Sequence, residues 1–193
     1  MKFPLFALLL VCAMTQAADR YPPQSIYNLE ATLTDQDGIA HSLDIHRGHP
    51  VLITMFYGSC PMACPMLIDT LRLTDQAAKA QPRARLRVVM ISIDPDRDNV
   101  SALQALASSR HIDTSRWALL RTDAASVRRI AAMLNVQYRR LPDGSFSHSS
   151  VISLLSPEGE ILQQSSVLAR ADPALVDALN AQSGAAQPRR ARP

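Results

Sequence analysis

Two uninterrupted apolar runs constrain the fold of this chain more than any other feature. Residues 51–57 read Val-Leu-Ile-Thr-Met-Phe-Tyr between Pro50 and Gly58, and residues 86–93 form a second run of the same kind. Such runs, rich in β-branched residues, are typical of strands buried on both faces of a sheet. Segments with helical spacing follow each run. The sequence therefore predicts one α/β domain, with a central mixed β-sheet flanked by helices.

The remaining patterns complete this architecture. Alternating apolar residues on either side of Asp37-Gly38 predict an N-terminal β-hairpin over residues 29–45. A helix begins near Pro65 and ends before Pro82, and Asp172 and Pro173 are placed to start the last helix. Further helices are predicted at 100–108, 124–134 and 171–180, and further strands at 117–120, 151–155 and 161–162.

Composition excludes several classes of function. The formal net charge is +3, and the arginines are scattered apart from a short group in the C-terminal tail, so the basic patch of a nucleic-acid-binding protein is missing. Three cysteines are too few for a disulfide scaffold, and six glycines disfavour a glycine-rich phosphate loop. Residues 182–193 are small, polar and basic, which indicates a flexible tail.

The N-terminus has the pattern of a cleavable export signal. Lys2 precedes an apolar run over residues 3–14, and small residues then predict cleavage after Ala17. The run is shorter than the ~20 apolar residues of a membrane-spanning helix. We therefore expect residues 18–181 to form a domain in the periplasm, with no stable membrane span after cleavage. Cys12 lies within the apolar run, so a lipoprotein anchored through that cysteine is one alternative. A signal that is not cleaved, which would also anchor the chain to the membrane, is the other.

Removal of the signal leaves two cysteines, Cys60 and Cys64, between the first buried strand and the helix that follows it. Pro65 suits the first helical position, which would place Cys64 at or beside the N-cap, where the helix dipole lowers a thiol pKa. A three-residue spacer brings both sulfurs to one side of the loop, close enough to share a soft metal ion or to form a disulfide. An inert disulfide or a buried thiol pair is the alternative. A structural zinc site is disfavoured because it needs four ligands.

Three motifs in order resemble the Sco/SenC family. They are Phe-Tyr-Gly-Ser-Cys-Pro-Met-Ala-Cys-Pro at 56–65, Ile-Ser-Ile-Asp-Pro-Asp-Arg-Asp at 91–98, and Phe-Ser-His-Ser at 146–149 followed by Ser-Pro-Glu-Gly at 156–159. The resemblance spans about residues 28–162 and implies a thioredoxin-like fold. Members of this family are copper proteins that assist assembly of the binuclear copper centre of cytochrome c oxidase.

The resemblance also implies a metal site and a function. Cys60 and Cys64 correspond to the family's thiolate ligands and His148 to its third ligand, for copper as Cu(I), Cu(II) or both. The implied activity is that of a metallochaperone, with the copper-bearing subunit of cytochrome c oxidase or another copper protein as partner. Ser147 stands where the family usually has an aspartate, so a carboxylate that could support the imidazole is missing there.

A second function is compatible with the same pair. Cys60 and Cys64 could serve a thiol–disulfide oxidoreductase, in which one cysteine attacks a target disulfide and the other resolves the intermediate, with thiol–disulfide proteins as partners. A peroxidase is a weaker interpretation. Cysteine-protease chemistry is weaker again, because the pair lacks a local nucleophile signature.

An acidic turn follows the second buried strand. Asp94, Asp96 and Asp98 occupy a position where α/β folds often place functional loops. We favour a solvated turn in which Asp94 or Asp98 caps the helix from Asn99 onward over a role in metal handling.

Two further groups carry weaker signals. Met62 is expected at the surface and Met66 in the core, with thioether contacts to copper as the alternative. His41, His46 and His49 are expected to be solvent-exposed, with a weak accessory metal site as the alternative. Trp117 is expected to be a packing residue.

Overall fold

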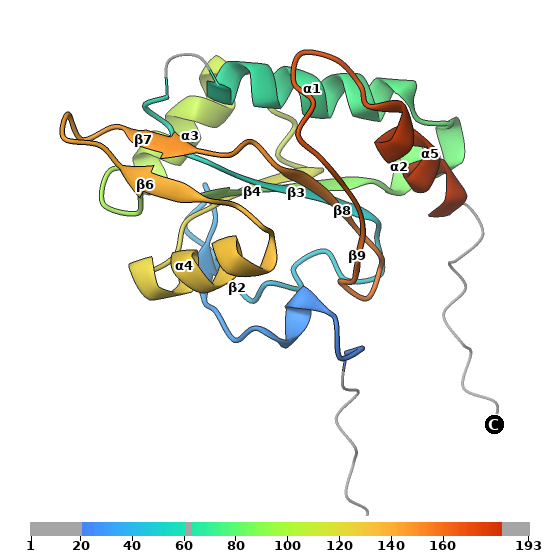
Figure 1. Ribbon diagram of the computed structural model, residues 1–193, viewed down its shortest axis with the longest axis horizontal. Coiled ribbons are helices and arrows are strands. Elements are labelled where there is room, and N and C mark those ends of the chain that lie inside the picture. The colour runs from blue at the N-terminus through green and yellow to red at the C-terminus, as the bar shows by residue number, and fades with distance from the viewer. Residues whose placement is uncertain (1–20, 61–62, 183–193) are drawn as a thin grey trace, which may run out of the picture.

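The computed structural model describes residues 21–60 and 63–182, and a five-stranded mixed sheet lies at its centre (Figure 1). The strand order is β5-β4-β3-β8-β9; β3 pairs parallel with β4 and antiparallel with β8. The strands of this sheet are β3 (Val51–Phe56), β4 (Arg87–Ser92), β5 (Trp117–Leu120), β8 (Ile152–Leu155) and β9 (Ile161–Ser165). The expected export signal at 1–17 with Cys12, the residue Met62, and the tail beyond residue 182 lie outside the described residues.

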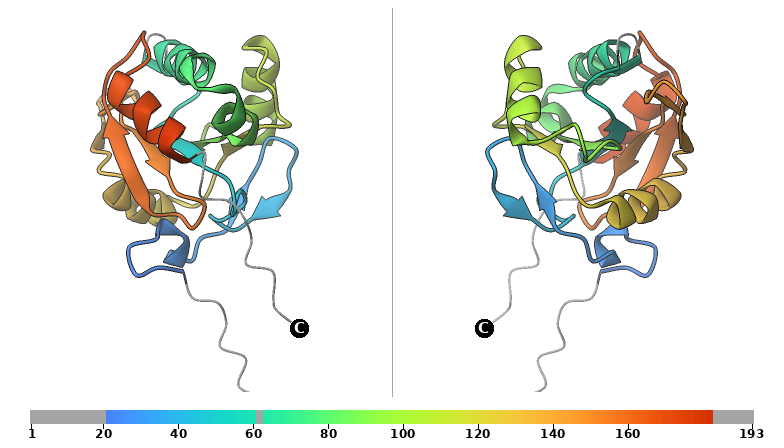
Figure 2. Two further views of the ribbon diagram at one scale, coloured as in Figure 1. Left: turned by 90° about the vertical axis from the view of Figure 1, so that its right-hand side faces the viewer. Right: turned by 90° about the vertical axis from the view of Figure 1, so that its left-hand side faces the viewer.

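Helices cover both faces of the sheet. Figures 1 and 2 show α1, α3 and α5 on one face, and α4 together with the N-terminal segment on the other. The helices are η1 (Ile26–Asn28), α1 (Ala63–Ala77), α2 (Ala80–Arg85), α3 (Val100–Ser109), α4 (Ala124–Met133) and α5 (Pro173–Ala181). Within residues 21–60 and 63–182, no helix combines the length and the apolar character needed to cross a membrane.

Strand β3 is buried on both faces, as its apolar run predicts. Leu52 and Phe56 pack into the cluster beneath α1, α3 and α5, whereas Ile53 and Met55 pack into the cluster beneath α4. Each of these four side chains is at most 1% exposed. Because successive side chains of a strand point to opposite faces, one continuous apolar run supplies both halves of the core.

The predicted helix that begins near Pro65 and ends before Pro82 is α1, and a short second helix, α2, follows it and was not predicted from the sequence. Helix α1 ends at Ala77, and α2 begins at Ala80 with Pro82 in its first turn. Proline is tolerated there because the first backbone N–H groups of a helix have no intrahelical partner. The predicted start of α5 is confirmed, since the Asp172 carboxylate accepts a hydrogen bond of 3.0 Å from the N–H of Ala174.

Two small hairpins lie outside the main sheet. The predicted N-terminal hairpin is present but short, with β1 (Leu33–Thr34) paired to β2 (Ala40–His41). The second, β6 (Tyr138–Arg140) with β7 (Phe146–His148), was not predicted from the sequence. Its signal was the Pro142-Asp143-Gly144 turn, whose glycine has the positive φ of +80° that favours this residue.

Candidate metal centre

The loop after β3 that carries Cys60, here called the cysteine loop, and strand β7, which carries His148, lie at the same end of the central sheet. Strand β3 ends at Phe56, four residues before Cys60, and its antiparallel neighbour β8 begins at Ile152, four residues after His148. Close to this end, the Thr54 hydroxyl donates a hydrogen bond of 2.7 Å to the carbonyl of Val151. The pairing of β3 with β8 therefore brings together two motifs that are far apart in the sequence.

Three potential ligands converge at this point. The sulfurs of Cys60 and Cys64 and a ring nitrogen of His148 all lie within 4.8 Å of one another, and no other such group of three occurs in the described part of the chain. Both cysteines are thiols in the structure. Two soft sulfurs and one imidazole form a donor set that suits copper.

Cys64 is the buried member of the pair. It is 3% exposed, and its thiol donates a hydrogen bond of 3.0 Å to the carbonyl of Tyr57. It is the second residue of α1, which begins at Ala63, so it lies one residue further into the helix than the expected position at or beside the N-cap. The expected lowering of its pKa is also wrong, because burial raises the pKa of the Cys64 thiol. Metal binding must therefore displace a thiol proton.

Cys60 differs from Cys64 in its surroundings. Its side chain is partly exposed and packs against both core clusters at the end of β3. Its backbone N–H donates a hydrogen bond of 3.2 Å to the carbonyl of Tyr57. The Tyr57 carbonyl thus accepts from both cysteines, and Cys60 is the less buried residue of the pair.

The ring nitrogens of His148 have the hydrogen-bonding pattern expected of a metal ligand. Its Nδ1 lies 3.1 Å from the carbonyl oxygen of Ser149, and since a carbonyl only accepts, Nδ1 carries the proton. The other nitrogen, Nε2, is buried and has no hydrogen-bond partner among the described residues. Burial also lowers the pKa of His148 and so favours the neutral imidazole. A buried lone pair without a partner is the feature that a bound metal would satisfy.

Tyr57 contacts both halves of the site, a role that sequence reasoning missed because it treated this residue as part of a buried strand. Its ring lies edge-on to the His148 imidazole, and its hydroxyl donates a hydrogen bond of 3.3 Å to the carbonyl of Phe146. Burial raises the pKa of Tyr57, so the phenol stays protonated. The residue joins the cysteine loop to the β6–β7 hairpin.

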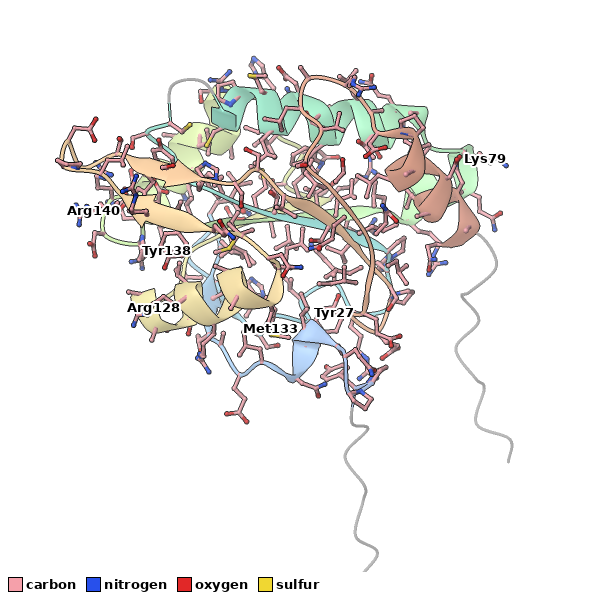
Figure 3. All side chains as sticks on the ribbon, in the orientation of Figure 1. Tyr27, Lys79, Arg128, Met133, Tyr138 and Arg140 are labelled. Atoms are coloured by element: carbon pink, nitrogen blue, oxygen red, sulfur yellow. The ribbon has the colours of Figure 1, made fainter. Side chains whose placement is uncertain are left out.

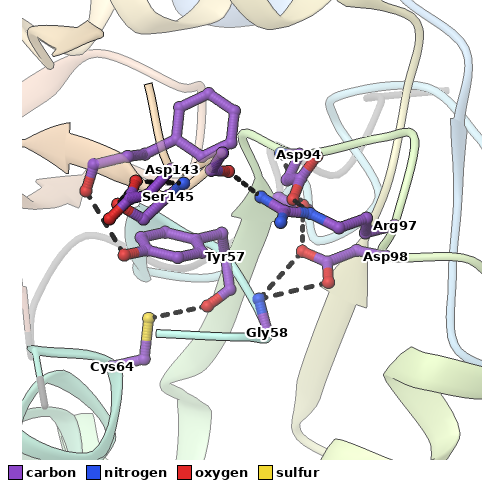
Figure 4. A network of polar contacts seen from close by, with 11 residues as sticks. Tyr57, Gly58, Cys64, Asp94, Arg97, Asp98, Asp143 and Ser145 are labelled. Atoms are coloured by element: carbon purple, nitrogen blue, oxygen red, sulfur yellow. Dashed lines mark hydrogen bonds and ion pairs between the residues drawn. The ribbon is translucent and has the colours of Figure 1, made fainter. Parts of the chain in front are cut away.

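Asp98 holds the backbone of the cysteine loop (Figure 4). Its carboxylate accepts from the Gly58 N–H, at 2.9 Å to Oδ2 and 3.2 Å to Oδ1, and from the hydroxyl of Ser92. Burial raises the pKa of this carboxyl. The expectation that Asp94 or Asp98 caps α3 is wrong: Asn99 is the cap and accepts from the Ala102 N–H at 3.0 Å. Asp98 instead points inward, toward Gly58.

Residues 21–181 match the SCO1/SenC family. The chain belongs to this family. Among its relatives is the SCO1 protein homolog of Bacillus subtilis, which is 26% identical over 164 residues that cover 82% of each chain. The SCO1/SenC assignment confirms the resemblance carried by the three sequence motifs.

Several solved structures have the same fold as this SCO1/SenC chain. A putative electron transfer protein from Aquifex aeolicus has a TM-score of 0.70 at 20% identity, covering 86% of this chain and 93% of its own. ScoI from Arabidopsis thaliana, solved with copper bound, has a TM-score of 0.67 at 21% identity, covering 79% and 94%. The predicted thioredoxin-like fold is confirmed.

The weaker candidates have mixed outcomes. Met66 is 36% exposed, so its expected core position is wrong, whereas Trp117 is buried as expected. The three hairpin histidines do not form a group of metal ligands in the part of the chain that the structure describes. His41 pairs with Asp35 at 2.7 Å, and His49 Nδ1 lies 2.9 Å from the carbonyl of Arg85. All three histidines are partly buried, so their expected exposure to solvent is wrong.

Proposed function

We propose that this protein is an exported copper metallochaperone that binds copper through Cys60, Cys64 and His148. The observation that carries the proposal is that two sulfurs and one buried imidazole nitrogen lie within 4.8 Å of one another. Among the described residues, that nitrogen has no hydrogen-bond partner. Family membership and the copper-bound Arabidopsis relative support copper as the cargo. Copper is here a cargo that the protein takes up and releases.

The donor set suits copper in both oxidation states. Thiolates of Cys60 and Cys64 are soft ligands for Cu(I), and the harder imidazole of His148 adds a donor preferred by Cu(II). Each ligand exists in a form that a metal can capture: a partly exposed thiol, a buried thiol and a neutral imidazole. Capture releases thiol protons, so copper affinity is expected to rise with pH.

The sequence supports a location and a class of partner. The apolar run over residues 3–14 supports export to the periplasm, and the family resemblance supports delivery to the copper-bearing subunit of cytochrome c oxidase or to another copper protein. Transfer would proceed by ligand exchange at the partly exposed Cys60, because Cys64 is buried.

The test is an anaerobic copper titration of reduced residues 18–193 against a competing chelator. We expect the wild-type protein to retain one equivalent of copper and the Cys60→Ser and Cys64→Ser variants to lose it. His148→Ala should weaken Cu(II) more than Cu(I). His111→Asn is the matched control, because it removes an exposed imidazole at a residue with a φ of 49°, which asparagine tolerates. A wild-type protein that does not hold copper would overturn the proposal.

A second candidate, a thiol–disulfide oxidoreductase, is favoured by the unequal exposure of the two thiols. The partly exposed Cys60 would attack a target disulfide and form a mixed disulfide, releasing one target thiolate. The buried Cys64 would then attack the Cys60 sulfur, forming the Cys60–Cys64 disulfide and releasing the second target thiolate. His148 has no part in this exchange. Disulfide reduction that persists in His148→Ala, in a protein that does not retain copper, would establish this candidate in place of the first.

A further inference from the structure

The turn at residues 94–98 contacts both halves of the metal site through two adjacent residues. Asp98 points toward the cysteine loop and Arg97 toward the β6–β7 hairpin that carries His148 (Figure 4). The proposed function uses neither side chain as a ligand.

On the cysteine side, the contact is close and buried. Asp98 is 3% exposed and accepts twice from the Gly58 N–H, two residues before Cys60. A Cβ atom at Gly58 would lie only 2.6 Å from Asp98 Oδ1, so the backbone approaches as near as glycine allows. The hydroxyl of Ser92, at the end of β4, fixes the same carboxylate.

On the histidine side, Arg97 joins three groups. Its guanidinium donates to the carbonyl of Gly144 at the tip of the hairpin and to the buried carboxylate of Asp94. The same group lies 6.0 Å from the centre of the Phe146 ring, within cation–π range. Phe146 lies two residues before His148 on the same strand.

The hairpin needs such contacts. Strands β6 and β7 pair with each other and form a two-stranded sheet separate from the central one. An isolated two-stranded hairpin is marginally stable in water, so its position depends on side chains that attach it to the domain. Arg97 and Tyr57 both reach it, at Gly144 and at the Phe146 carbonyl respectively.

The turn that carries both residues is itself ordered. The backbone N–H groups of Arg97 and Asp98 both donate to the carbonyl of Asp94, at 3.1 and 2.9 Å. Because the two side chains leave adjacent positions of one hydrogen-bonded turn, a shift of either half of the site relative to the other must break a contact of this turn.

We propose that Arg97 and Asp98 form a brace that fixes the His148 hairpin relative to the cysteine loop. Arg97 is the positioning residue for the hairpin, and Asp98 is the positioning residue for the loop. The part of the proposal that concerns copper rests on the proposed function: the brace aligns the imidazole with the two sulfurs. The position of the hairpin in the metal-free protein does not depend on copper.

The first test therefore uses metal-free protein and hydrogen–deuterium exchange. In Arg97→Ala we expect exchange in residues 138–148 to become at least about tenfold faster, with the central sheet unchanged. Arg97→Lys should lie between this variant and wild type, because an ammonium keeps the charge but loses the planar guanidinium that bonds two partners. Asp98→Asn should act instead on the segment around Gly58.

Arg140→Ala is the matched control, since it removes the same charge from an exposed residue of the same hairpin (Figure 3). Arg97→Ala exchange equal to that of wild type or of Arg140→Ala would overturn the brace. Faster exchange across the whole domain in both Arg97→Ala and Arg97→Lys would also overturn it, in favour of a general role in folding.

The second test measures copper. Arg97→Ala should weaken Cu(II) by about 10- to 100-fold, the usual effect of losing a group that orients a ligand, and should reduce the nitrogen hyperfine signal of His148. Cu(I) affinity should change much less, because the thiols remain in place. In a His148→Ala background, Arg97→Ala should have no further effect, and an additive loss would overturn the brace. If wild-type protein binds no copper, the proposed function fails, and the exchange experiment still decides the brace.

Discussion

The aromatic ring of Tyr57 stands edge-on to the imidazole of His148, with ring centroids 5.6 Å apart and planes at 77°. The backbone carbonyl of Tyr57 accepts from the Cys64 thiol. The same carbonyl accepts from the backbone N–H of Cys60. One residue at the end of β3 therefore contacts all three candidate ligand residues, and its side chain and backbone have separable roles.

Replacing Tyr57 should separate the ring from its hydroxyl. Tyr57→Phe loses the hydroxyl's hydrogen bond of 3.3 Å to the Phe146 carbonyl and its contact with Cys60, so we expect a loss of about 1 kcal/mol in unfolding free energy. Tyr57→Ala removes a buried ring and should cost about 3–5 kcal/mol. Urea unfolding of metal-free protein measures both, with Tyr138→Phe as the control. Equal losses in Tyr57→Phe and Tyr57→Ala would assign the stabilisation to the hydroxyl instead.

A methyl group at Gly58 should push against Asp98. Because the added Cβ would lie 2.6 Å from Oδ1, Gly58→Ala should destabilise the fold by about 1–3 kcal/mol. Ser59→Ala, at the exposed neighbouring position, should stay within about 0.5 kcal/mol of wild type. In a double-mutant cycle with Asp98→Ala the two losses should not add, since the clash disappears with the carboxylate. Additive losses would contradict the close contact.

The stability of the metal-free protein should fall as the solution is acidified. Burial, assisted by the nearby charges of Arg87, His49 and His41, lowers the pKa of His46 from 6.5 to about 4, and its buried Nε2 has no partner within the described residues. Between these pH values the unfolded chain binds a proton that the folded chain refuses, so stability is present above about pH 6.5 and is lost toward pH 4. The contribution is on the order of 2 kcal/mol.

Urea unfolding of wild-type and His46→Leu protein near pH 7 and near pH 5 measures this term. The variant should lose less stability on acidification than wild type, whereas His111→Asn, which removes an exposed imidazole, should behave like wild type. An unchanged pH dependence in His46→Leu would show that other groups cause the acid sensitivity.

Ser147→Asp should have little effect on copper binding, although it restores the residue usual in the family. Ser147 is exposed, whereas its strand neighbour His148 is partly buried, and neighbouring side chains of a strand point to opposite faces. The Nδ1 of His148 is already bonded to the Ser149 carbonyl. We expect Cu(II) affinity within about threefold of wild type by chelator competition, far below the 10- to 100-fold effect of a residue that supports a ligand. A gain of tenfold or more would show that the carboxylate reaches the imidazole.

Sequence patterns predicted the helices and strands whose burial or ends are determined by residues within the segment itself. The continuous apolar run of β3 indicated burial on both faces, and Asp172 with Pro173 indicated the start of α5, and both predictions are confirmed. Helix α2 was missed because Pro82 was interpreted only as a signal that follows a helix end, whereas proline is also tolerated in the first turn of a helix.

For the site, sequence could indicate ligand types but not their surroundings. The motif named Cys60, Cys64 and His148, which the fold brings together. It could not show that burial would govern the pKa of Cys64, because burial depends on packing against β3 and the rest of the core. It could not show that Asp98 would turn toward Gly58 rather than cap α3, because local capping geometry and a distant backbone N–H compete for the same carboxylate.

The pairing of β3 with β8 has a consequence for the energetics of the whole molecule. The two thiols and the imidazole come within reach of one another only when these strands are side by side, so an unfolded chain cannot offer the complete set of donors. Any ion that requires all three donors is a ligand of the native state alone. At a free concentration one hundred times its dissociation constant, such an ion would raise the unfolding free energy by about 2.7 kcal/mol. Metal occupancy of the site and the free energy of unfolding are therefore thermodynamically linked.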